Sequence, residues 1–238
     1  MASTVSPDPT GHYVQRTLRW KGASHPYCVW LPPGFDPNRA WPAILFLHGA
    51  GECGNDGVKP TRVGIGPTLE AHPEAWSFVV VFPQKPLEDD EWWEHEELAL
   101  KILDTATREF AMDRDRIALV GMSQGGHGAW FLGARFPERW SALVPICGYG
   151  RPRMGRRVAR IPVWAFHGLR DDIVDPADTR RITDDIRETR ARLGLPAEGL
   201  RVTLYPEANH GSWEPAFRES ELPKWLLAQR RTPTQPKP

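Results

Sequence analysis

The chain has 238 residues, of which 40% are hydrophobic and 25% are charged, so it is long enough to bury a large core and its composition is not that of a disordered chain. Its 30 Lys and Arg residues balance 30 Asp and Glu residues, whereas proteins that bind nucleic acid usually carry a basic excess. The longest apolar runs, such as residues 78–82, have the length of a strand and are too short to span a membrane.

Both ends of the chain are predicted to be flexible tails. Ser, Thr and Pro are frequent in residues 1–11, and residues 231–238 offer no apolar side chain to bury. The N-terminal segment lacks the basic and apolar regions of a secretory signal. We therefore expect a cytoplasmic protein, or a secreted one if the sequence is a processed mature form.

Strands and helices alternate through the single domain expected at residues 12–230. A hairpin is predicted first, at 13–20 and 27–31. Continuous apolar runs of about five residues then suit strands buried on both faces, at 43–47, 78–82, 117–120, 142–146, 163–166 and 202–205. Helical patterns lie at 96–110, 126–136, 176–193 and 213–229, the last made irregular by two prolines. This alternation predicts an α/β fold, with a mostly parallel central sheet flanked by helices.

The three cysteines, Cys28, Cys53 and Cys147, are too few and too scattered to form a disulfide framework. No CxxC pair indicates a zinc site. The sequence leaves open whether two of the three cysteines pair.

A candidate nucleophile lies in the segment GMSQG, residues 121–125, which has the G-x-S-x-G pattern. It follows a predicted strand and precedes a predicted helix, which is the strand–turn–helix setting of a nucleophile elbow. The turn holds the serine in a strained conformation, and its glycines let neighbouring backbone approach closely. The pattern therefore predicts Ser123 as a nucleophile. The alternative is a glycine-rich turn that carries a surface serine.

A serine nucleophile needs a base, and His210 follows the last predicted strand, where open α/β sheets place their sites. The carboxylate that orients this base should follow the preceding strand, where Asp171, Asp172 and Asp175 all occur. Choosing Asp171 gives the chain order Ser–Asp–His, which is that of α/β hydrolases. Spacing alone does not separate Asp171 from Asp172.

The negative charge that develops during acyl transfer needs two fixed N–H donors. The backbone N–H of Gln124, directly after the nucleophile, is predicted to be one donor. The loop HGAGE, residues 48–52, follows the strand at 43–47 and is predicted to supply the other. We favour the N–H of Ala50, with Gly49 and Gly51 as alternatives.

Five segments between residues 45 and 217 resemble the α/β-hydrolase superfamily. More narrowly, they resemble single-domain bacterial carboxylesterases, often called predicted peptidases, that are related to polyhydroxybutyrate-depolymerase-like and feruloyl esterases. The segments are LFLHGAGECG (45–54), VVFPQ (80–84) followed by two tryptophans, DRIALVGMSQGGHGAWFLGARFPERWSALVPICG (115–148), PVWAFHGLRDDIVD (162–175) and YPEANHGSWEPAF (205–217).

The resemblance implies an α/β-hydrolase fold for residues 12–230, with Ser123 as nucleophile, Asp171 as acid and His210 as base. Its His-Gly-x-x-Asp pattern places the acid at Asp171. The chain departs from the family at Cys53, where Arg is usual, beside the predicted oxyanion loop. It also departs at position 124, where Met is frequent, a change that should matter little if that residue acts through its backbone.

Aromatic residues in loops near the predicted site are candidates to hold an acyl or aryl group. These are Trp92, Trp93 and Trp213, and His127, early in the helix after the nucleophile, is a fourth candidate. The alternative for each is packing in the core or at its rim. The connection at 147–161 is short and rich in Arg, so no cap domain is expected and the site should be open.

These observations predict a serine carboxylic-ester hydrolase that forms an acyl-enzyme intermediate on short-chain or aryl esters, without a metal or cofactor. Its partner is a small-molecule ester, and no nucleic acid or membrane span is expected. The alternatives are a serine peptidase or amidase, and a hydrolase fold that binds without catalysis. The sequence does not determine the oligomeric state.

Overall fold

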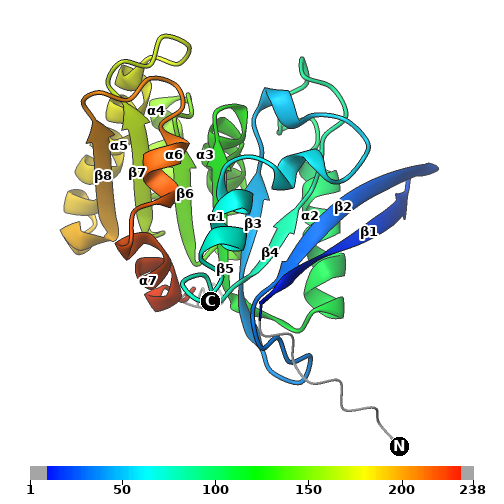
Figure 1. Ribbon diagram of the computed structural model, residues 1–238. Coiled ribbons are helices and arrows are strands. Elements are labelled where there is room, and N and C mark those ends of the chain that lie inside the picture. The colour runs from blue at the N-terminus through cyan, green and yellow to red at the C-terminus, as the bar shows by residue number, and fades with distance from the viewer. Residues whose placement is uncertain (1–9, 232–238) are drawn as a thin grey trace, which may run out of the picture.

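The computed structural model describes residues 10–231 and contains one eight-stranded sheet, ordered β1-β2-β4-β3-β5-β6-β7-β8 (Figure 1). The hairpin β1–β2 pairs antiparallel, and β2 runs antiparallel to β4. The remaining neighbours pair in parallel, from β4 through to β8. The strands are β1 (His12–Trp20), β2 (Ala23–Leu31), β3 (Trp41–Leu47), β4 (Val79–Phe82), β5 (Met112–Met122), β6 (Ala142–Ile146), β7 (Val163–Gly168) and β8 (Leu200–Tyr205).

Helices cover both faces of the sheet, as predicted (Figure 1). One face packs against α2 (Glu96–Glu109), α3 (Gln124–Arg135), α4 (Pro152–Val158) and α5 (Pro176–Arg192). The other packs against α1 (Ile65–Ala71), α6 (Trp213–Phe217) and α7 (Glu221–Ala228). Short 3₁₀ turns are η1 (Ala50–Glu52), η2 (Lys59–Thr61), η3 (Pro137–Arg139) and η4 (Ala197–Gly199).

Strand β3 shows why the inner strands are continuous apolar runs. Successive side chains of a strand point to opposite faces of the sheet. Leu45 and Leu47 belong to the core on the α2–α3 side, and Ile44 and Phe46 to the core on the α1–α6 side. All four are completely buried. Because both faces are covered by helices, no position in this strand can be polar at low cost.

The C-terminal region differs from the single irregular helix predicted at 213–229. Two helices form, α6 and α7, and each has its proline at the third position. Pro215 and Pro223 lack an N–H, and the first turn of a helix needs no N–H donor. Each proline therefore stands near the start of its own helix. The sequence analysis also missed α1 and α4, which are short and carry glycine or proline.

The connection from β6 to β7 contains only the short helix α4, as expected for a fold without a cap domain. Of the predicted tails, residues 1–9 and 232–238 lie outside the described residues. Arg231 donates hydrogen bonds to Asp115. The three cysteines are free and buried.

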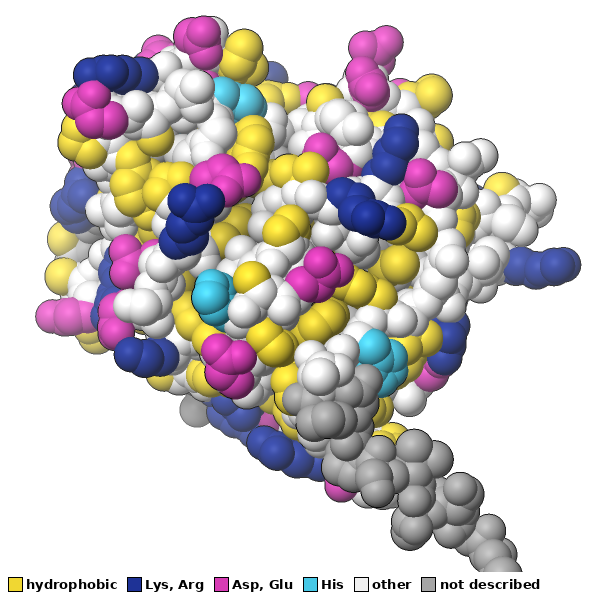
Figure 2. Space-filling model, viewed as in Figure 1, with side chains coloured by type: hydrophobic (Ala, Val, Ile, Leu, Met, Phe, Trp, Pro, Cys, Tyr) yellow, Lys and Arg dark blue, Asp and Glu magenta, His cyan; other side chains and the backbone are white. Residues whose placement is uncertain are grey.

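Basic and acidic side chains are mixed over the face in Figure 2, in keeping with the zero net charge. Within residues 10–231, no helix has the length and apolar character needed to cross a membrane. The parallel strands end at a common edge of the sheet, and the loops that follow β3, β5, β7 and β8 meet there. These four loops carry the residues that the sequence analysis singled out.

Candidate active site

Ser123 occupies a tight turn between β5 and α3. Its backbone has φ 55° and ψ −122°, a conformation that costs a non-glycine residue about 1–3 kcal/mol. The glycines on either side make the turn feasible. A Cβ at Gly121 would lie 2.0 Å from the Gly125 carbonyl oxygen, and one at Gly125 would lie 2.0 Å from the Leu47 carbonyl oxygen. Only glycine fits at these two positions, so the turn has the backbone geometry expected of a nucleophile elbow.

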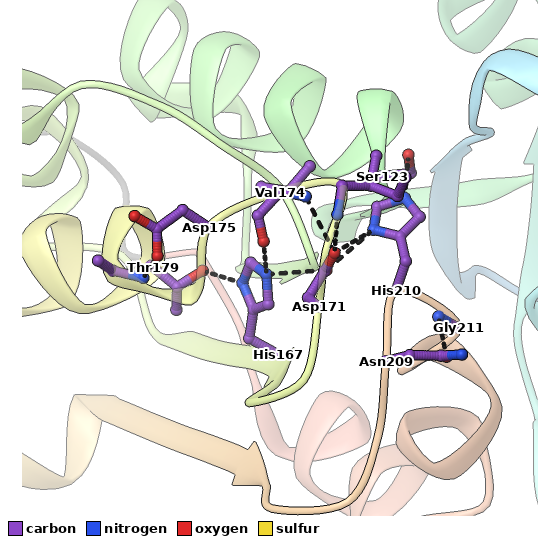
Figure 3. Close-up of polar contacts among 11 residues, drawn as sticks. Ser123, His167, Asp171, Val174, Asp175, Thr179, Asn209, His210 and Gly211 are labelled. Carbon is purple, nitrogen blue, oxygen red and sulfur yellow. Dashed lines mark hydrogen bonds and ion pairs between the residues drawn. The ribbon is translucent and has the colours of Figure 1, made fainter.

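The structure brings Ser123, His210 and Asp171 together in one hydrogen-bond chain (Figure 3). Ser123 Oγ lies 2.8 Å from His210 Nε2. On the other side of the imidazole, Nδ1 lies 2.9 Å and 3.0 Å from the two carboxylate oxygens of Asp171. Asp172 is exposed, and Asp175 instead caps α5 by accepting from the Ala177 N–H. Asp171 is therefore the carboxylate that the fold turns toward His210.

The side chain of Asp171 is completely buried, yet its surroundings favour the ionised form. Burial raises the pKa of this carboxyl group, but hydrogen bonds from the Val174 N–H, from His210 and from the Ile173 N–H outweigh burial and lower it. The two backbone donors lie 2.9 Å and 3.0 Å from Oδ1. Asp171 therefore remains a fixed negative charge beside the imidazole.

His167, a buried residue of β7, is a second neighbour of Asp171. It contacts the Val174 carbonyl oxygen, at 3.0 Å from Nε2. The same Nε2 lies 3.1 Å from Asp171 Oδ2, and Nδ1 lies 2.7 Å from Thr179 Oγ1. Burial lowers the pKa of His167, so the ring is neutral. The sequence could have indicated this contact, because His167 lies near the end of β7, only four residues before Asp171.

Two backbone N–H groups beside Ser123 stand at helix starts, where N–H groups have no partner within the helix. Gln124 is the first residue of α3, and Ala50 is the first residue of η1. A Cβ at Gly49 would lie 3.4 Å from Ser123 Cβ, so the loop after β3 adjoins the nucleophile. The Gly49 N–H already donates to Glu52, at 3.0 Å. This bond favours Ala50 over Gly49 as a donor.

The predicted pocket residues lie in different environments. Trp92, one of the pocket candidates, packs in the core instead. Its side chain is only 1% exposed, and its Nε1 donates to the His48 carbonyl oxygen at 3.0 Å. Trp93 is 41% exposed and packs its edge on the buried ring of His127. Trp213 is half-buried and stands edge-on to His210, with 5.5 Å between ring centres. Of these tryptophans, Trp213 is the one whose ring contacts a residue of the hydrogen-bond chain.

A polar cluster that the sequence analysis missed lies behind His127. Nδ1 of His127 is 3.3 Å from Glu91 Oε2, and the hydroxyl of Tyr149 donates to the other carboxylate oxygen of Glu91. Burial raises the pKa of Glu91, but hydrogen bonds from His127 and Tyr149 outweigh it and lower the value. The cluster joins the loop before α2 to the first turn of α3, close to Gln124.

Two surface hollows, of about 520 Å³ and 360 Å³, are lined by residues other than Ser123, Asp171 and His210. The candidate site is therefore located by its hydrogen-bond chain. Trp93 lines the smaller hollow, between the β1–β2 hairpin and the start of α2.

Among the described residues, one group has spacing suited to a metal ion. Atoms of Cys147, Asp171 and His210 lie within 4.8 Å of one another. Burial raises the pKa of the Cys147 thiol to about 12, and metals bind the thiolate. Asp171 and His210 are also held in the chain to Ser123. With the thiol protonated and the other two side chains engaged in the hydrogen-bond chain, these three residues do not fit a resident metal ion.

Comparison with known proteins places the chain among esterases. A family model described as "Putative esterase" matches residues 22–181. The bifunctional acetylxylan esterase/xylanase of Neocallimastix patriciarum is 23% identical over 198 residues, and the match covers 79% of this chain and 27% of that protein. The chain thus spans about a quarter of this curated relative.

Two solved structures share the architecture. A thermostable esterase superposes with a TM-score of 0.78 at 28% identity, covering 92% of this chain and 63% of that chain. A mutant of the feruloyl esterase module from Clostridium thermocellum, complexed with sinapinate, superposes with a TM-score of 0.72 at 16% identity. That match covers 100% of this chain and 95% of the module, and at this identity it shows the fold alone.

Proposed function

Because the chain belongs to the Esterase family, within the α/β-hydrolase superfamily, we propose that it is a serine carboxylic-ester hydrolase that works through an acyl-enzyme intermediate. The observation that carries the proposal is the 2.8 Å contact between Ser123 Oγ and His210 Nε2, with Asp171 on the far side of the imidazole. Nucleophile, base and orienting carboxylate are the three parts that acyl transfer needs.

In the proposed reaction, Ser123 Oγ attacks the ester carbonyl carbon while His210 Nε2 takes the hydroxyl proton. Asp171 holds the Nδ1–H and stabilises the imidazolium that forms. The backbone N–H groups of Gln124 and Ala50 donate to the carbonyl oxygen as it becomes negative. His210 then protonates the leaving alcohol, and a water molecule that it activates releases the acid. Every step uses groups of this chain and water.

We propose short-chain or aryl esters as substrates. The similar acetylxylan esterase/xylanase is named for an acetyl ester. The feruloyl esterase module, which shares the fold, is bound to sinapinate, an aromatic acid. The exposed ring of Trp93 and the ring of Trp213 beside His210 offer apolar contact for an acyl or aryl group. No cap closes over these residues within the described chain, so large alcohol groups would extend into solvent.

The test is hydrolysis of p-nitrophenyl esters of increasing acyl length, methyl ferulate and a matched p-nitroanilide. We expect ester turnover, and a loss of kcat on the order of 10⁶-fold in Ser123→Ala with the fold intact. Ser24→Ala, on the exposed β1–β2 hairpin, is the matched control and should keep full activity.

Three outcomes would contradict the proposal. Ester turnover that survives in Ser123→Ala would remove Ser123 as the nucleophile. Faster turnover of the anilide than of the ester would indicate an amidase. Failure of the folded protein to hydrolyse any ester and to react with a fluorophosphonate would indicate a fold that binds without catalysis.

A further inference from the structure

Lys85 is a completely buried lysine in the loop after β4. Its Nζ donates to the Leu87 carbonyl oxygen at 2.6 Å and lies 3.1 Å from Cys53 Sγ. No carboxylate within residues 10–231 forms an ion pair with it. Burying an ammonium group is unfavourable unless it is well bonded, and lysine is almost never fully buried. Because burial of this lysine is costly, its role is to be sought in the contacts that its side chain and backbone make.

Lys85 contacts both ends of the segment 48–54, which contains the predicted oxyanion loop at 48–52. Its backbone N–H donates to His48 Nε2 at 3.2 Å, and its carbonyl oxygen accepts from the Gly54 N–H at 3.0 Å. The Nζ–Cys53 contact lies between these two. One residue of the neighbouring loop thus holds the start, the middle and the end of this segment.

Two of these contacts continue to a single atom, the Gly49 carbonyl oxygen. His48 Nδ1 lies 2.6 Å from it, and Cys53 Sγ lies 4.0 Å from it. Because His48 Nε2 accepts from the Lys85 N–H, the neutral ring carries its proton on Nδ1 and donates to Gly49. Burial, with a further effect of the Lys85 charge, lowers the pKa of His48 to about 3, so the ring is neutral. Both routes from Lys85 therefore end on this carbonyl.

A fixed Gly49 carbonyl also fixes the Ala50 N–H. The peptide unit is planar and trans, so its C=O and its N–H point in opposite directions. With the carbonyl turned toward His48 and Cys53, the Ala50 N–H points away from them. The Gly49 N–H is engaged by Glu52 and is therefore not free to donate to a substrate.

We propose that Lys85 is a positioning residue for the oxyanion hole: through Cys53 and His48 it fixes the Gly49–Ala50 peptide and so aims the Ala50 N–H at the ester carbonyl oxygen. The proposal rests on the proposed esterase function. A positioned donor stabilises charge only where charge develops, so its loss should lower kcat and leave KM nearly unchanged.

The test is Lys85→Met, which keeps an unbranched side chain one atom shorter and the backbone N–H but removes the ammonium group. Removing an oxyanion donor lowers kcat about 10²–10³-fold. Lys85→Met removes only the route through Cys53 and leaves the route from the backbone N–H through His48, so kcat should fall by a fraction of that effect, about 3–10-fold. KM should change less than about twofold, and affinity for a trifluoromethyl ketone, which mimics the transition state, should fall by the same factor as kcat. A folded Lys85→Met with wild-type kcat would overturn the proposal.

The matched control is Lys59→Met. Lys59 is exposed, and its Nζ also reaches residue 53, at 3.3 Å from the Cys53 carbonyl oxygen. It takes no part in the routes to Gly49, so this variant should keep wild-type kcat and ketone affinity. Equal losses in the two variants would show that loss of a lysine near Cys53, rather than this geometry, is the cause.

If Lys85→Met does not fold, Cys53→Ala decides the question, because it breaks the sulfur route and leaves the lysine in place. It should lower kcat and ketone affinity together by about 3–10-fold, a fraction of the effect of losing a donor. Unchanged kcat in Cys53→Ala would overturn the proposal.

A spectroscopic measurement separates this inference from the proposed function. The ¹⁵N NMR shifts of His48 report its tautomer in the resting protein, whether or not it hydrolyses esters. We expect a neutral ring with the proton on Nδ1 near neutral pH. A proton on Nε2, or a charged ring, would overturn the positioning argument. The expected tautomer in a protein that hydrolyses no ester would instead contradict the esterase proposal alone.

Discussion

His48 should make the protein sensitive to acid well above the pH at which its carboxylates titrate. Its side chain is completely buried, and burial lowers its pKa from 6.5 to about 3. Between these values the unfolded chain binds a proton that the folded protein does not bind, so stability is full above pH 6.5 and falls as the pH falls toward 3. The loss is about 1.4 kcal/mol per pH unit, or about 5 kcal/mol over the whole range. That is a large share of the 5–15 kcal/mol by which domains are typically stable.

Urea unfolding, followed by tryptophan fluorescence at several pH values between 7 and 4, measures this effect in wild type and in His48→Gln, which is uncharged throughout. Lowering the pH from 6.5 to 4.5 should cost wild type about 2–2.5 kcal/mol more than the variant. His167, whose pKa burial also lowers, contributes equally to both and cancels. His72→Gln, at an exposed position, should leave the wild-type slope unchanged. Equal slopes in wild type and His48→Gln would refute the reasoning.

Two further predictions use neighbouring residues as controls. Asp171→Asn should lower kcat for a p-nitrophenyl ester by about 10³–10⁴-fold, because it removes the charge that holds the His210 tautomer. Asp172→Asn, at an exposed position, should leave kcat unchanged. Comparable losses of kcat in the two variants would contradict the assignment of Asp171. Gly125→Ala should lower the free energy of unfolding by about 3 kcal/mol or more, or prevent folding, because its Cβ would overlap the Leu47 carbonyl oxygen. The added Cβ of Gly51→Ala would meet open space, so this control should keep the wild-type Tm. A normal Tm for Gly125→Ala would show that the turn can relax.

Much of the fold could be predicted because its signals are local. Buried parallel strands read as apolar runs, and the α/β class predicted from their alternation with helices was confirmed. The turn at Ser123 was also readable, since its two glycines are required by the backbone approach within that turn and against β3. The order of the strands in the sheet was not predicted, because pairing joins segments far apart in the chain.

The errors occurred where local patterns allow several structures. The prolines of the C-terminal region were read as irregularities of one helix, although each stands in the first turn of its own helix. Trp92 was a candidate for the pocket because it lies in a loop, with core packing as the alternative, and its ring turns inward to His48. A loop position does not determine whether a side chain points to solvent or to the core.

The sequence by itself determined the α/β class, the strand–turn–helix around Ser123 and the chain order of the three candidate catalytic residues. It left Asp171 and Asp172 equal in spacing, and only the tertiary structure turned one carboxylate inward to His210 and left the other in solvent. The same holds for Lys85, which in the sequence is one charged residue among 60 Lys, Arg, Asp and Glu and in the fold is a buried cation behind the oxyanion loop. Burial and orientation depend on contacts between segments distant in the chain, and these contacts exist only when the sheet has assembled.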